Sequence, residues 1–242
     1  YFVAYKIGDE TAPAIAADNE LYGAYATVSD VGPGALDLYA LYNRTEGAVE
    51  TDQQSFGARY AFDGSVTGRF EGTLQTGTRS GADVSAYMFG ARLGKGFADG
   101  KAAMTLWYDY LSGDDAATAE NEVFHTLYAT NHKFYGYADL FLNIPVHTKN
   151  AGLQDMAVKL AWRPQADISF GADFHSFSAA EQGTLSTSHF GNELDFTLSH
   201  RYSANMSATV GFARVLQDDG FAEIGRLSED MTWFYVMLNA IF

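Results

Sequence analysis

The stretch VTGRFEGTLQT, from Val66 to Thr76, decides the fold class because its side chains alternate strictly between two kinds. In an extended chain, one face carries Val, Gly, Phe, Gly and Leu, and the other carries Thr, Arg, Glu, Thr and Gln. Successive side chains of a strand point to opposite sides, so the pattern predicts a strand with one apolar and one polar face. Its length exceeds the five or six residues usual in soluble strands and matches a tilted strand that crosses a bilayer.

The same alternation recurs along most of the chain, and no helical period competes with it. Clear repeats lie at residues 102–109, 155–162, 168–175, 193–201 and 206–212. We predict about twelve strands, near residues 1–7, 20–29, 35–44, 55–62, 66–76, 84–97, 101–110, 152–162, 168–177, 190–201, 206–216 and 232–242.

Short links alternate with long polar links between these strands. The long links are expected at residues 8–19, 45–54, 77–83, 111–151, 178–188 and 217–231. Short turns at one rim and long loops at the other are typical of bacterial outer-membrane barrels. We therefore predict an all-β fold, a transmembrane antiparallel up-and-down β-barrel over residues 1–242, with a long extracellular loop near 111–151. A soluble β-sandwich also alternates, but strand length and loop asymmetry favour the barrel.

Composition excludes several classes of function. Thirty acidic against fifteen basic residues give a net charge of −15, which disfavours a nucleic-acid partner. The absence of cysteine excludes disulfide scaffolds and thiol catalysis. No apolar run approaches the roughly 18 residues of a spanning helix, and the first residues lack the pattern of a signal peptide.

The last predicted strand, Thr232 to Phe242, ends on an aromatic residue, with alternate apolar side chains on the same face. It resembles the C-terminal recognition strand of outer-membrane barrels, so Phe242 is expected to be a membrane-insertion signal. The alternative is a closing strand that ends on Phe by chance.

The charged residues at the predicted inward positions must face the lumen, because a charge on the lipid face costs about 2 to 4 kcal/mol at the bilayer midplane. They either select solutes through the field that they create or pair across neighbouring strands and fill the interior. The predicted pore-lining residues are Arg59, Arg69, Glu71, Arg92, Asp109, Asp155, Lys159, Asp173, Glu193, Asp195 and Arg201.

The long link near residues 111–151 is rich in aromatic side chains, and a loop of this length usually has a use. It is expected either to enter the lumen as a constriction or gate, or to form a packed extracellular cap. The candidate loop and gate residues are His132, Lys133, Phe134, Tyr135, Tyr137 and Asp139.

Two segments resemble the alginate-export family of outer-membrane proteins. They are TNHKFYGYADLFLNIP, from Thr130 to Pro145, and GLQDMAVKLAW, from Gly152 to Trp162. The resemblance implies a porin through which an anionic polyuronate passes, with an electropositive constriction. Barrels of this family typically have more than twelve strands, so the chain is either the C-terminal part of a larger barrel or a complete twelve-strand barrel. The mixed charges of the predicted lining show no arginine-dominated anion path.

The predicted function is a Gram-negative outer-membrane channel that passes a solute passively. An alginate-like polysaccharide or anionic sugar is the favoured solute. The alternatives are a general small-solute porin and a non-conducting barrel that anchors a periplasmic or surface protein. No G-x-S-x-G or H-E-x-x-H motif is present, so no enzyme, catalytic residue, metal or cofactor is predicted. The expected partners are outer-membrane lipid and lipopolysaccharide, together with the anionic polysaccharide or small solute.

Overall fold

The computed structural model describes residues 2–7, 19–46 and 50–241. They form one antiparallel sheet of twelve strands in sequence order, which confirms the predicted up-and-down arrangement. The strands are β1 (Phe2–Ile7), β2 (Asn19–Val31), β3 (Gly34–Thr45), β4 (Thr51–Phe62), β5 (Thr67–Arg79), β6 (Ala82–Phe97), β7 (Ala102–Leu111), β8 (Leu153–Gln165), β9 (Ile168–Ser178), β10 (His189–Ser203), β11 (Met206–Gln217) and β12 (Met231–Ala240). Phe242, the predicted insertion signal, lies outside the described residues.

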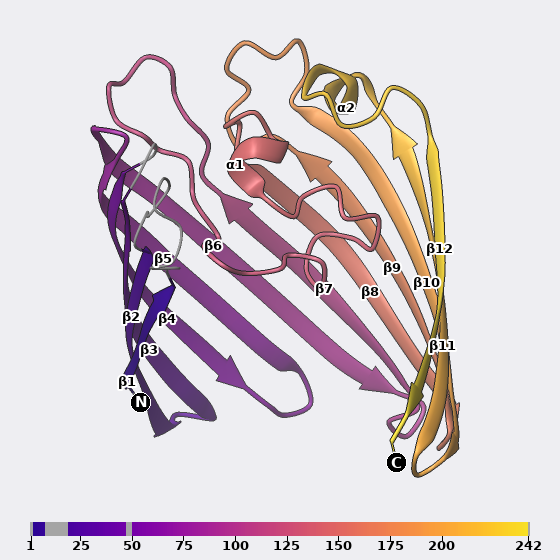
Figure 1. Ribbon diagram of the computed structural model, residues 1–242. Coiled ribbons are helices and arrows are strands. Elements are labelled where there is room, and N and C mark those ends of the chain that lie inside the picture. The colour runs from indigo at the N-terminus through magenta and orange to yellow at the C-terminus, as the bar shows by residue number, and fades with distance from the viewer. Residues whose placement is uncertain (1, 8–18, 47–49, 242) are drawn as a thin grey trace.

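The sheet curves like the wall of a barrel, with β1 and β12 as its two edges (Figure 1). Among the residues that the structure describes, β1 pairs only with β2, and β12 pairs only with β11. The contact between first and last strands that a closed twelve-strand barrel requires is therefore not made within this part of the chain. In lipid an unpaired backbone group costs several kcal/mol, so both edges need partner strands in the membrane.

The two faces of the sheet differ as the alternation predicts. On β5, Leu74 is 61% exposed, whereas the next residue, Gln75, is 2% exposed. The convex face carries exposed apolar side chains from most strands, which suits contact with lipid tails. They include Leu38, Phe56, Leu74, Phe89, Leu106, Leu160, Phe196 and Val210. We call the opposite, concave face the inner face.

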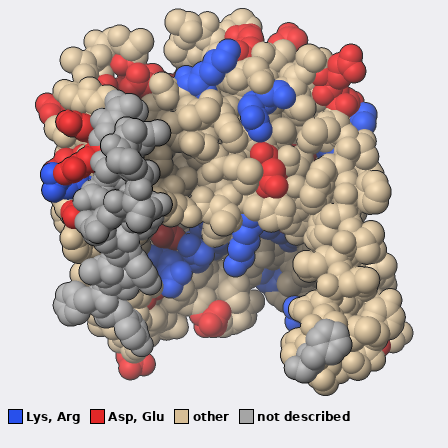
Figure 2. Space-filling model, viewed as in Figure 1, with Lys and Arg blue, Asp and Glu red and all other residues tan. Residues whose placement is uncertain are grey.

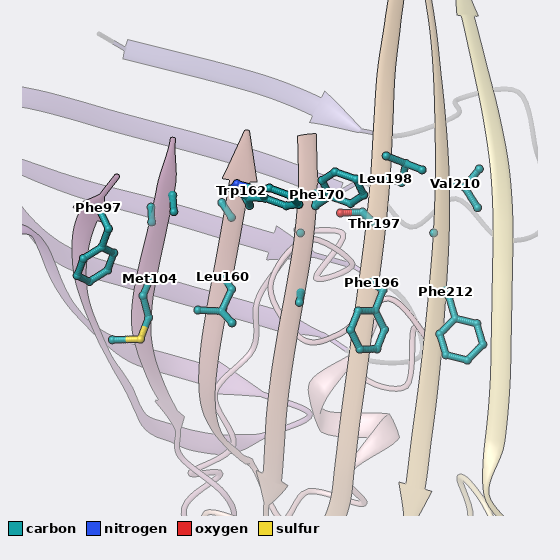
Figure 3. Close-up of a pocket in the computed structure, with 16 residues that line it drawn as sticks. Phe97, Met104, Leu160, Trp162, Phe170, Phe196, Thr197, Leu198, Val210 and Phe212 are labelled. Carbon is teal, nitrogen blue, oxygen red and sulfur yellow. The ribbon is translucent and has the colours of Figure 1, made fainter. Parts of the chain in front are cut away.

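A hollow of about 640 Å³ lies among the side chains of β6 to β11 (Figure 3). Exposed apolar side chains line it, including Leu160, Phe196 and Val210. Along the strands these positions alternate with inner-face residues such as Lys159 and Asp195. The hollow therefore belongs to the lipid-facing surface and not to the candidate pore.

One predicted long link is wrong. The segment 77–83 was expected to be a loop, but β5 and β6 continue through it and are joined by Ser80 and Gly81 alone. Both residues have positive φ, 52° and 82°, as in the two-residue turns that match the twist of a hairpin. Gly77 and Thr78 lie within the paired strands.

The segment between β7 and β8, residues 112–152, lies on the concave side of the sheet (Figure 1) and is called the inner loop. It carries α1 (Ile144–His147), while α2 (Asp219–Glu223) lies in the link from β11 to β12. Among the described residues, no helix is long and apolar enough to cross a membrane. Phe141 of the inner loop packs on Phe177, Phe190 and Phe221, with ring centroids 4.8, 5.9 and 5.9 Å away. This apolar core holds the loop against β9, β10 and α2.

Candidate functional site

Strand register brings the predicted lining residues together across the inner face. Asp37 of β3 stands opposite Arg59 of β4, and Arg59 stands opposite Glu71 of β5. Arg59 Nε donates to Asp37 Oδ2 at 2.8 Å, and Arg69 forms an ion pair with Glu71. Asp37 is absent from the predicted lining. Its signal was a lone charge between Leu36 and Leu38, at the position where alternation requires an inward side chain.

The centre of the inner face carries a cation on an aromatic ring. The Arg92 guanidinium lies 3.6 Å from the centroid of the Trp107 ring, and Lys159 Nζ lies 5.0 Å from it. Asp109 Oδ2 accepts from Arg92 Nη2 at 2.9 Å and from Trp107 Nε1 at 3.1 Å. The Trp107 ring thus attracts both positive charges through cation–π contacts, while Asp109 fixes the geometry of Arg92.

A second cluster spans β8 and β9. Lys159 Nζ donates to Asp173 Oδ2 at 2.9 Å and to His175 Nε2 at 3.1 Å. Since Nε2 accepts from a lysine, Nδ1 carries the ring proton and donates to Asp155 at 2.9 Å. His175 is fully buried in the barrel wall. His175 is absent from the predicted lining.

In the ion pairs of the inner face, the basic side chain is more exposed to solvent than its acidic partner. The Arg59 side chain is 36% exposed against 7% for Asp37, and Arg69 is 32% exposed against 16% for Glu71. The same order holds for Arg92 with Asp109 and for Lys159 with Asp173. Figure 2 shows Lys and Arg side chains gathered in the hollow of the molecule. In all four pairs the basic group therefore lies nearer the lumen than its carboxylate.

Glu193 and Asp195 lie beneath the inner loop and hold its backbone. Glu193 Oε1 accepts from the Ala138 amide at 2.8 Å, and Asp195 Oδ2 accepts from the Tyr137 amide at 3.3 Å. Gly136 has a φ of 81°, and a Cβ atom there would lie 2.4 Å from Glu193 Oε2. The positive φ, together with this close approach, favours glycine at this position. Both carboxylates face inward but are covered by the loop.

Arg201 lies apart from the other predicted lining residues. It sits at the short-turn rim, where Arg201 Nη2 donates to the Ala166 carbonyl at 3.3 Å. It does not join the central charge network.

The predicted gate residues of the inner loop form two groups of contacting side chains, one around His132 and one around Phe134. His132 Nδ1 and Asp139 Oδ1 are 2.5 Å apart, and the His132 ring packs on Tyr137 with centroids 5.8 Å apart. Phe134 contacts Trp107 at 6.1 Å between centroids, while Lys133 Nζ lies 5.9 Å from the centroid of the Phe134 ring. Tyr135 is buried, and this burial raises the pKa of its hydroxyl.

The tip of the inner loop, residues 125–128, forms hydrogen bonds with side chains of β3 and β5. Gln75 Oε1 accepts from the His125 amide at 2.9 Å, and Gln75 Nε2 donates to the His125 carbonyl at 2.8 Å. Tyr128 Oη donates to Asn43 Oδ1 at 3.0 Å. A cavity of about 210 Å³ lies beneath the tip, lined by Arg69, Arg92 and other side chains. The loop therefore crosses the inner face beside the central charge network.

We expect the docked tip to weaken in acid. Burial, together with the positive charge of Arg79, lowers the pKa of His125 from 6.5 to about 4. Its Nδ1 accepts from the Leu127 amide at 2.9 Å, a bond that protonation removes. The unfolded chain binds this proton at higher pH, so stability falls from about pH 6.5 and the loss is complete below about pH 4.

The measurement is the thermal unfolding midpoint at pH 7 and at pH 4. The midpoint of the unmodified chain should drop by roughly 3 °C more than that of His125→Gln, whose side chain does not titrate. Equal drops in both proteins would show that His125 is not the titrating group.

Residues 7–223 match the alginate export family. No curated protein matches this chain at a significant level. Among solved structures, the outer membrane protein OprD from Pseudomonas aeruginosa has a TM-score of 0.53 and 11% identity, over 97% of this chain and 62% of OprD. Pseudomonas aeruginosa OccK11 (OpdR) has a TM-score of 0.50 and 12% identity, over 97% of this chain and 69% of that chain. The KdgM porin has a TM-score of 0.41 and 10% identity, over 100% of this chain and 98% of KdgM. The likeness to OprD and OccK11 shows a shared barrel fold.

Proposed function

We propose that this chain, which belongs to the alginate export family, guides an anionic, sugar-like solute passively along its inner face. The protein is a porin-like channel of the bacterial outer membrane, and its lipid-facing surface suits contact with outer-membrane lipid and lipopolysaccharide. We assign an alginate-like polysaccharide or anionic sugar as the solute because of the charges that line the lumen.

The observation that carries this assignment is the asymmetry of the ion pairs. The paired groups nearly balance in formal charge, which is why the sequence showed no anion path. A solute in the lumen, however, meets Arg59 and Arg69 before it meets the shielded carboxylates of Asp37 and Glu71. Fixed cations along a narrow wall favour anions over cations. The carboxylates keep the guanidinium groups in place.

Two alternatives have specific support. The near balance of paired charges suits a general porin for small solutes of either sign. The apolar core around Phe141 fills part of the interior, which suits a non-conducting barrel that anchors a periplasmic or surface protein. An enzymatic role has less support, because the Nε2 atom of the Asp155-bonded His175 accepts from Lys159 and not from a serine hydroxyl.

Single-channel recording in a planar bilayer tests the proposal. We expect stable conductance that prefers anions and is blocked more strongly by an oligomeric polyuronate than by a neutral oligosaccharide. The double variant Arg59→Gln/Arg69→Gln should lower the anion-to-cation permeability ratio by roughly two- to threefold and weaken the polyuronate block.

Arg214→Gln is the matched control, since it removes one positive charge from the outward side of β11, where Arg214 pairs with Asp230 at 2.7 Å. Its permeability ratio should equal that of the unmodified chain. Conductance that neither sugar blocks would favour the general porin. Folded protein without conductance would favour the anchor.

A further inference from the structure

A second cavity lies on the other side of the loop tip, toward the rim with the long loops. It has a volume of about 270 Å³, and we call it the mouth pocket. Its walls come from the ends of β2, β3, β4 and β5 and from the loop tip. Asn43, Gln53, Arg79 and Tyr128 are among its polar lining residues. The volume lies just below the roughly 300 to 1,000 Å³ of pockets for drug-sized ligands, so the pocket suits one small polar molecule.

Gln53 supplies a buried donor without a partner. Its side chain is 1% exposed, and its Oε1 accepts a hydrogen bond from Arg79 Nη2. A guanidinium can only donate, so this bond fixes which end of the amide faces Arg79. Among the described residues, the Nε2 atom at the other end has no hydrogen-bond partner. Buried polar groups are normally satisfied, which indicates that an acceptor is missing from the pocket.

Arg79 differs from the basic residues of the central network. Its guanidinium donates only to neutral amide oxygens, those of Gln53 and of Asn121, the latter at 3.4 Å. Within the described part of the chain it contacts no carboxylate, whereas Arg59, Arg69 and Arg92 each have one. A half-buried guanidinium with neutral partners retains its attraction for an anion, and its fork matches a carboxylate.

The remaining groups add donors and a ring. Asn43 Oδ1 accepts from Tyr128, which leaves the Asn43 amide nitrogen as a donor. His125, which lines the same pocket, is neutral above about pH 4 and adds no negative charge. The ligand must therefore bring several oxygen acceptors and one negative charge.

We infer that the mouth pocket binds a single hydroxylated carboxylate of about the size of one sugar unit. Arg79 holds the carboxylate, while Gln53 Nε2 and the Asn43 amide donate to ring or hydroxyl oxygens. The site is separate from the central charge network and would remain a binding site in a barrel that does not conduct. Failure of the pocket and failure of the proposed channel are therefore distinguishable.

Isothermal titration of the folded protein in detergent tests the inference, with D-glucuronate, D-glucose and acetate as probes. Glucuronate should bind about tenfold more tightly than glucose, which lacks the charge, or acetate, which lacks the hydroxyls. Arg79→Gln should weaken glucuronate binding about tenfold, while Arg214→Gln should leave it unchanged.

A second variant guards against loss of folding in Arg79→Gln. Gln53→Leu keeps the charge of Arg79 but removes the amide donor, and it should weaken glucuronate more than acetate. Equal affinity for glucuronate and glucose would overturn the inference. So would unchanged glucuronate binding in whichever of the two variants folds.

Discussion

Replacing Asp109 by alanine is expected to lower the free energy of unfolding by about 3 to 5 kcal/mol. Asp109 is buried on the inner face and is the only carboxylate that pairs with Arg92 among the described residues. Its loss leaves the Arg92 guanidinium buried at the centre of the wall, with the Trp107 ring as its remaining charge-stabilising contact. Trp107 also loses the acceptor of its ring N–H. Denaturant unfolding of the refolded barrel, followed by tryptophan fluorescence, measures the change.

The control for Asp109→Ala is Glu46→Ala. Glu46 pairs with Arg44 at 2.6 Å, but both side chains are about half exposed. Such a pair contributes about 0 to 1 kcal/mol because water solvates either partner alone. A double variant, Arg92→Met/Asp109→Leu, removes both charges and should be less destabilised than Asp109→Ala. Equal losses for Asp109→Ala and Glu46→Ala would contradict a buried, essential pair.

Replacing Phe141 by alanine is expected to cost about 3 to 5 kcal/mol and to release the inner loop from the wall. The Phe141 ring lies in the apolar core between the loop, β9, β10 and α2. Alanine leaves a cavity among Phe177, Phe190 and Phe221, which are held in place by separate strands or by α2. Because the loop crosses the inner face, its release should raise the single-channel conductance as well as lower the unfolding free energy.

Leu142→Ala is the control for Phe141→Ala, because the adjacent side chain points away from the core. Leu142 is 40% exposed, whereas Phe141 is 1% exposed. Leu142→Ala should change stability by less than about 1 kcal/mol and leave conductance unaltered. A destabilised Phe141→Ala protein with unchanged conductance would show that the loop does not restrict the pore.

The alternation of apolar and polar residues predicted the strands well, because successive side chains of a barrel strand face lipid and lumen in turn. It failed at residues 77–83, where a long link was predicted although backbone pairing continues to Arg79. It also left Asp37 and His175 without partners. Those partners lie on neighbouring strands, and only the register shows which inward residues stand opposite each other.

The sequence by itself determined the class of fold, the number of strands and the inward orientation of the predicted lining residues. These follow from local chemistry, since a charge that faces lipid at the bilayer midplane is costly and successive side chains point to opposite sides. The tertiary structure alone decided which groups pair, how far each reaches into the lumen and where the inner loop docks. Phe141 meets Phe221, and His125 meets Gln75, across long stretches of sequence. Such contacts depend on curvature and packing of the whole sheet, which no local pattern records.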